Sequence, residues 1–213
     1  MTTKFLQCAA GMAVVATMLA AGCSKSTKEV SVSKQSQAPA SQEAPAQPVA
    51  AKTAFWPMYT AAHQWAADIV VLRVDAKELP GYKNEAGKAA MWEAVFASPS
   101  RHEYRTYTYA IAAVAPNIYK GVDAGLEMPW GGETRDAMAI DMNAFNVDSD
   151  AAYQAAAAAA AEWLKKNPTK DLTTVAMGDT YKFQEPVWYV MWGTKQGGYA
   201  AFVDANSGKV LNR

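Results

Sequence analysis

Two histidines and two neighbouring serines are the side chains that could build a catalytic site in this chain of 213 residues. His63 falls in a helical pattern, whereas His102 lies in a turn that also holds Ser98 and Ser100. A serine, a histidine and an aspartate together can carry out acyl transfer, but the sequence lacks the Gly-x-Ser-x-Gly turn that exposes such a serine. We therefore expect no enzyme and interpret His102 as a polar turn residue.

The sequence offers no pattern for a metal or a phosphate. It has no His-x-x-x-His pair and no cluster of carboxylates with histidine. The stretch 204–208 resembles a calcium loop superficially, but its glycine comes one residue early and the chain ends before a bidentate glutamate could follow. Gly131-Gly132 and Gly197-Gly198 open no helix, so neither predicts a phosphate loop. We expect no cofactor and no metal, and we predict a turn at 204–208.

The N-terminal segment is typical of a protein that is exported. An uncharged run from Phe5 to Ala21 follows Lys4, and it is too short for a spanning helix. Its end, Leu-Ala-Ala-Gly-Cys at 19–23, resembles the bacterial lipobox, although Ala20 stands where the pattern usually has leucine. This resemblance implies a signal peptide at 1–22 and lipidation of Cys23. The alternative is an ordinary signal peptide that leaves the Cys23 thiol free.

The cysteine count favours the lipid. Cys8 would leave with the signal, so Cys23 is the one thiol of the mature chain and no disulfide can form within it. A diacylglycerol and a further acyl chain such as palmitate would give a stable anchor, since one chain alone binds a membrane only marginally. Ser24 is compatible with sorting to the outer membrane, facing the periplasm, in a Gram-negative cell. We expect a lipid-anchored protein of the cell envelope.

Residues 23–54 are predicted to form a disordered linker. They are rich in Ser, Gln, Ala and Pro and have no aromatic side chain, so they cannot bury enough apolar surface to order themselves. Over the whole chain 20 basic residues balance 20 acidic ones, and the sequence has no basic stripe. A nucleic-acid partner is therefore not expected.

The remaining residues predict an α+β fold made of two α-β-β-β units, 55–147 and 148–213. Pro57 suits a first helical turn, and a helix should run to about Asp68. Asp148, Ser149 and Asp150 can cap a second helix that ends before Pro168. Strands are expected at 69–74, 89–98, 103–112, 118–122 and 137–141, and then at 172–177, 187–193, 199–204 and 209–211.

An internal repeat supports the two units. The segment AAMWEAVF, which contains Trp92, aligns with EPVWYVMW, which contains Trp188, and each tryptophan follows a loop and precedes a hairpin. In both units we expect a helix that packs on an antiparallel sheet. Tyr153, Ala157, Ala160 and Leu164 should face the sheet of the second unit, because they recur at helical spacing.

The second unit also resembles a known domain. Its Ala-rich helix, Pro186-x-Trp188 and the ending Val-Asp-Ala-x-Ser-Gly-x-Val at 203–210 are similar to the PepSY domain, and the whole body looks like a group of bacterial lipoproteins with such domains. The resemblance implies a cystatin-like fold of a helix on a sheet, and a role in binding or restraining peptidases. It carries no catalytic residue over to this chain.

Aromatic side chains are the remaining candidates for a binding site. Trp130, followed by Gly131 and Gly132 in a predicted loop, is hard to explain as core, and Tyr189 must face away from Trp188 along its strand. We predict that these residues contribute to binding an exported protein, with a peptidase as one candidate. The alternative is a small-molecule or cell-wall ligand held in a pocket between the two units.

Overall fold

The computed structural model describes residues 46–183 and 185–211. The chain separates into two compact units, Met1–Gln42 and Glu43–Arg213, and the described residues all belong to the second. The predicted signal peptide and residues 23–45 of the predicted linker, including Cys23, lie outside the described residues.

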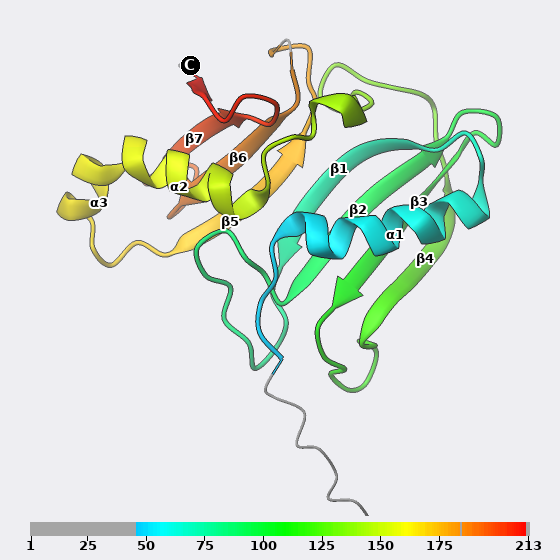
Figure 1. Ribbon diagram of the computed structural model, residues 1–213, viewed down its shortest axis with the longest axis horizontal. Helices are drawn as coiled ribbons and strands as arrows, with labels where there is room; N and C mark the ends of the chain where they lie inside the picture. Colours follow the sequence, from blue (N-terminus) through cyan, green and yellow to red (C-terminus); the bar gives the residue numbers. More distant parts are fainter. Residues whose placement is uncertain (1–45, 184, 212–213) are drawn as a thin grey trace, which may run out of the picture. The chain divides into compact units, whose positions relative to one another are not determined.

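The eight strands of the described residues belong to one antiparallel sheet with the order β4-β3-β2-β1-β5-β6-β7-β8 (Figure 1). The α+β class is confirmed. The strands are β1 Val70–Lys77, β2 Met91–Ser98, β3 Glu103–Ala110, β4 Gly121–Pro129, β5 Leu172–Gly178, β6 Val187–Trp192, β7 Tyr199–Asp204 and β8 Val210–Leu211.

The helices lie on one face of this sheet (Figure 1). They are α1 Ala51–Trp65, α2 Ser149–Ala159 and α3 Ala161–Lys166, with a short 3-10 turn, η1, at Met142–Ala144. Helix α1 packs on β2 and β3, and α2 packs on β6 and β7. Among residues 46–183 and 185–211, no helix lies over the opposite face of the sheet, and we call it the uncovered face.

The sheet consists of two similar halves. Each half runs from a helix into four strands that are added outward from the centre, where β1 pairs with β5 in antiparallel orientation. An approximate twofold axis therefore passes between β1 and β5. The helix-then-meander order predicted for both units is confirmed, but each half has four strands instead of three, and the two halves share one sheet.

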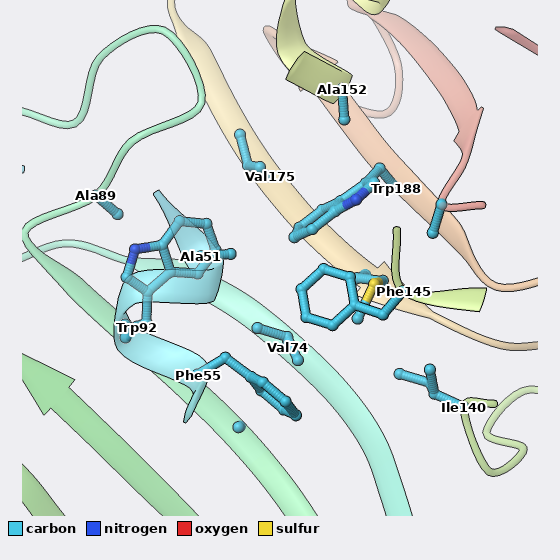
Figure 2. Packing of buried hydrophobic residues seen from close by; sticks show 14 of the residues in the cluster. Ala51, Phe55, Val74, Ala89, Trp92, Ile140, Phe145, Ala152, Val175 and Trp188 are labelled. Carbon is cyan, nitrogen blue, oxygen red and sulfur yellow. The ribbon is translucent and has the colours of Figure 1, made fainter. Parts of the chain in front are cut away.

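The core between sheet and helices is continuous across the two halves. Trp92, Trp188, Phe55 and Val74 are fully buried, and Figure 2 shows them with Phe145 in the layer between α1 and the sheet. Helix α2 contributes mainly small side chains to this core, since Ala152, Ala156 and Ala160 are fully buried. Of the predicted stripe, Ala160 is fully buried, whereas Tyr153, Ala157 and Leu164 are half-buried. Alanines allow the helix to lie close to the strands.

Helix α1 begins earlier than the sequence predicts. It starts at Ala51, so the linker does not extend to residue 54, and Pro57 lies inside the helix rather than in its first turn. The cause is a pair of long-range contacts, because the Ala51 N–H donates to Ser149 Oγ at 2.8 Å and the Lys52 N–H donates to Asp148 Oδ1 at 3.0 Å. The first turn is thus capped by side chains from the other half.

Three further elements differ from the predictions. The segment 137–141 is not a strand, although Ile140 donates its N–H to Val71 O at 2.8 Å and closes the core. Strand β4 runs to Pro129 instead of ending at Val122, as an exposed edge strand. The single helix expected before Pro168 is interrupted at Ala160, where α2 ends and α3 begins.

Candidate functional site

Tyr189 projects from the middle of β6 onto the uncovered face. Its neighbours Trp188 and Val190 point into the core and are fully buried, whereas Tyr189 is half-buried. This alternation agrees with the prediction that Trp188 and Tyr189 lie on opposite faces. Tyr189 is therefore placed where a partner could reach it.

Tyr189 forms a group with two other aromatic rings. The ring of Phe202 on β7 lies 5.3 Å from that of Tyr189, and Phe183 from the β5–β6 loop lies 5.0 Å from Phe202. The ammonium of Lys182 stands 5.4 Å from the Phe202 ring centre. Aromatic rings with a cation at their margin supply much of the binding energy in protein interfaces. We call these three rings the aromatic cluster.

Four charged side chains lie beside the aromatic cluster on the same face. Arg73 Nε stands 2.6 Å from Asp75 Oδ2, and Lys77 Nζ stands 3.0 Å from Glu93 Oε1. Burial raises the pKa of the Asp75 carboxyl, and the charges of Arg73 and Lys77 oppose that shift. We call these four side chains the charged group. Cross-strand pairing places it next to the aromatic cluster, because Asp75 faces Ala176 and Ala176 faces Tyr189.

A hollow of about 1190 Å³ lies against this part of the sheet. Its lining includes Arg73, Tyr189, Met191, Phe202 and Leu211. It thus brings the charged residues Arg73, Asp136 and Lys195 together with apolar side chains of the second half. This combination can bind an extended or irregular polypeptide surface that offers both apolar and acidic groups.

The charged group is the part that the sequence analysis missed. Arg73, Asp75 and Lys77 alternate along β1, and such a period of two places all three on one face. The predicted strand ends at Val74 and therefore does not include Asp75 and Lys77. Extending the strand by three residues would have revealed the group.

The Trp130 loop is far from Tyr189. Trp130 follows β4, is half-buried, and donates its N–H to His102 O at 2.8 Å. Gly131 and Gly132 follow it, and Gly132 has a φ of 98° that favours glycine. Strands β4 and β6 are five places apart in the sheet, roughly 24 Å at the usual strand spacing. Trp130 and Tyr189 therefore cannot form one small site.

A second cleft, of about 990 Å³, lies where the two halves meet. It is bounded by the β1–β2 loop on one side and by α2, α3 and the start of β5 on the other. Tyr153, Leu164 and Trp192 form apolar parts of its wall, and the rim carries charges of both signs. This is the position where the alternative prediction expects a ligand pocket.

The serines of the β2–β3 turn bind an aspartate and not the histidine. Ser98 Oγ donates to Asp68 Oδ1 at 2.6 Å, and the Ser100 N–H donates to Asp68 Oδ2 at 2.8 Å. The hydroxyl of Ser98 and then the backbone N–H of Ser100 lower the pKa of Asp68 to about 2. His102 is exposed with a φ of 56°. These hydrogen bonds hold the β2–β3 turn against the segment that follows α1. That the chain is not an enzyme stays a prediction.

The stretch 204–208 forms the predicted turn. Asp204 Oδ1 accepts the N–H groups of Asn206 and Ser207, both at 2.8 Å, and Gly208 has a φ of 75°.

Within residues 46–183 and 185–211, no group of three or more histidine, cysteine or acidic side chains could hold a metal ion. In the same part of the chain, no helix has the length and apolar character needed to cross a membrane.

No family model matches the chain, and none of the curated proteins does. Among solved structures, a crystal structure of a "putative lipoprotein" from Clostridium difficile 630 aligns with 72% of this chain and 87% of its own, at 9% identity and a TM-score of 0.45. A likeness this weak carries no argument about fold or function. The resemblance to the PepSY domain therefore stays a prediction.

Proposed function

We propose that the chain is a lipid-anchored protein of the cell envelope that binds another exported protein through the uncovered face of its sheet. The observation that supports this most is the aromatic cluster of Phe183, Tyr189 and Phe202 beside the charged group on that face. The anchor rests on the Cys23 sequence. The role is binding and not catalysis, and in a Gram-negative cell the site is the outer membrane, facing the periplasm.

The chemistry of the face favours a protein over a small ligand. Tyr189 and Phe202 offer flat apolar area, while Arg73 keeps 53% of its side chain exposed although it pairs with Asp75. An acidic group on the partner could bind the free part of the Arg73 guanidinium next to the rings. A peptidase is the partner that the PepSY resemblance suggests, and binding at this face would restrain it without any reaction by this chain.

Capture with matched variants tests this proposal. The lipidated chain, carrying an affinity tag, is recovered from the envelope of its own bacterium after chemical cross-linking, and co-purified proteins are quantified. We expect an exported protein whose recovery falls at least tenfold with Tyr189→Ala/Phe202→Ala. Trp56→Ala on the outer side of α1 is the control, since Trp56 is 47% exposed and lies on the helix layer. The proposal would be refuted if the parent chain, the Tyr189→Ala/Phe202→Ala variant and the Trp56→Ala control recovered the same amount of the exported protein. It would also be refuted if no protein were recovered above background.

The cleft between the halves favours a second candidate function. Its volume of about 990 Å³ suits a small molecule or a cell-wall fragment, and Tyr153 and Trp192 offer rings for stacking. Tryptophan fluorescence measured during titration with soluble cell-wall fragments tests it. Saturable quenching that Tyr153→Ala weakens and Tyr189→Ala leaves unchanged would support this candidate, and no saturable change would count against it.

A further inference from the structure

Four loops meet at one end of the sheet. They connect β1 to β2 (78–90), β3 to β4 (111–120), α3 to β5 (167–171) and β6 to β7 (193–198). Antiparallel pairing puts them at the same end, since β1, β3 and β6 finish there while β2, β4, β5 and β7 begin there. We call it the tether end.

The N-terminal segment enters the folded unit at the tether end. Val49 and Ala89 exchange two backbone hydrogen bonds of 3.0 Å, and Ala89 belongs to the β1–β2 loop. Ala46 packs against a small cluster that includes Leu79 and Ile111, which come from two of the four loops. The described part of the chain therefore begins at this end, at residue 46 (Figure 1).

Charge is distributed unequally between the two ends. The four loops of the tether end hold five lysines and three acidic residues: Lys83, Lys88, Lys120, Lys170, Lys195, Glu78, Glu85 and Asp171. The five connections at the opposite end hold four basic and six acidic residues: Arg101, Arg135, Lys182, Lys209, Asp68, Glu133, Asp136, Asp141, Asp179 and Glu185. Asp148 is counted at neither end, because it caps α1 and lies next to the β1–β2 loop. The balanced total charge thus conceals a basic end and an acidic end.

Side chains at the tether end suit a membrane surface. Lys83, Lys88, Lys170 and Lys195 are exposed and form no ion pair with the described part of the chain. Tyr82 is 37% exposed and Tyr119 is 62% exposed. Tyrosine rings prefer the interface between lipid and water, and lysine ammonium groups are attracted by anionic headgroups. Both types are present on the loops that surround the point of chain entry.

We propose that the tether end lies on the anionic phospholipid surface of the membrane that holds the anchor. This inference rests on the proposed lipid anchor. Each lysine that approaches such a surface contributes roughly a fivefold preference for the bound orientation, and the acidic opposite end is repelled. The strands then stand away from the membrane, so the uncovered face with Tyr189 stays accessible from the side.

Single-cysteine labelling of the full, processed chain tests the orientation. Cys8 is removed and Cys23 is lipidated on the proposed pathway, so an introduced cysteine is the one free thiol. An environment-sensitive fluorophore is attached to Tyr119→Cys or, as control, to Ser207→Cys in the turn at the opposite end. The proteins are reconstituted into vesicles of phosphatidylethanolamine with or without phosphatidylglycerol. We expect a blue shift for the label at 119, only with phosphatidylglycerol and reversed by 1 M salt, and no shift for the label at 207.

Charge reversal distinguishes electrostatic binding of the tether end to the lipid surface from closeness to the membrane that the anchor alone would cause. Lys83→Glu/Lys170→Glu should abolish the blue shift at position 119, whereas Lys182→Glu/Lys209→Glu, with the same change in charge at the opposite end, should preserve it. The orientation would be refuted by equal blue shifts at positions 119 and 207. It would also be refuted by the absence of a shift at 119 while the protein sediments with both kinds of vesicle. Either result would leave the proposed anchor intact. Failure to sediment with either kind would refute the anchor and the orientation together.

Discussion

The indole rings of Trp92 and Trp188 meet edge to face, with centroids 6.4 Å apart and planes inclined by 75°. Trp92 Nε1 donates to Val49 O and Trp188 Nε1 donates to Val147 O, both at 2.9 Å. Each acceptor lies two residues before the helix of the same half. The two tryptophans therefore fasten both helix entries to the sheet and join the halves at the approximate twofold axis.

Replacing either tryptophan by phenylalanine should destabilise the whole unit. Trp188→Phe removes the indole donor from Val147 O, and Trp92→Phe leaves Val49 O with the Ala89 N–H alone. Both changes also remove buried ring atoms, so we expect a loss of about 2 to 4 kcal/mol in the free energy of unfolding. Urea denaturation followed by circular dichroism measures it. Trp56→Phe is the control, since Trp56 is exposed and the change should cost less than about 0.5 kcal/mol. A loss confined to one of the two core positions would contradict the symmetric role.

Contact between the first half and α2 depends on a glycine. Gly87 has a φ of 79°, and a Cβ there would lie 2.4 Å from Ser149 O and 2.7 Å from Tyr153 Cβ. Gly87→Ala should therefore lower stability by about 2 to 5 kcal/mol, through backbone strain and a steric clash. Gly81→Ala isolates the strain, because Gly81 has a φ of 86° and open space around it, and it should cost about 1 to 2 kcal/mol. Equal losses in thermal or urea unfolding would show that the close approach is unimportant.

The shared cap at the helix N-termini gives a third prediction. Ser149 is fully buried, and its hydroxyl oxygen accepts the Ala51 N–H at 2.8 Å. Ser149→Ala should cost about 1 to 2 kcal/mol in unfolding free energy, because it leaves a buried donor unpaired. Hydrogen exchange should quicken at the first turn of α1, 98 residues away along the sequence. Ser207→Ala in an exposed turn should change neither quantity, and an unaffected α1 in Ser149→Ala would refute the cap.

Much of the fold was predictable because its signals are local. Alternation in the strands and the repeat around Trp92 and Trp188 predict the two meanders correctly. The start of α1 was not predictable, because its cap comes from Asp148 and Ser149 in the other half. Strand β4, with the sequence GVDAGLEMP, has poor strand propensity and is extended by pairing with β3 along its length. In the candidate site, alternation predicts the position of Tyr189, whereas the contact of Phe183 with Phe202 depends on how the β5–β6 loop returns to the sheet.

The turn between β2 and β3 should make stability depend on acid pH. Hydrogen bonds from Ser98 and Ser100 lower the pKa of Asp68 from 3.8 to about 2. A depressed folded-state pKa stabilises the fold above the unfolded-state value, and this contribution is lost as the pH falls from about 4 to about 2. Asp68→Asn should therefore unfold more easily than the parent chain at pH 6, with the difference shrinking toward pH 2. Chemical denaturation across this range measures it, and a difference independent of pH would contradict the assignment.

Membrane attachment should depend on Cys23 alone. Cys23→Ala removes the thiol that the lipobox resemblance assigns to the lipid, so the chain should either leave the membrane fraction or remain uncleaved. Cys8→Ala alters the other cysteine, which lies inside the predicted signal peptide, and should leave processing and attachment unchanged. Fractionation with intact mass measurement distinguishes the outcomes, because the parent chain should weigh more than the polypeptide 23–213 by the mass of its acyl groups. Unchanged membrane association of a cleaved Cys23→Ala chain would refute the anchor, since the tether end with five lysines and three acidic residues is too weakly basic to hold the protein by itself.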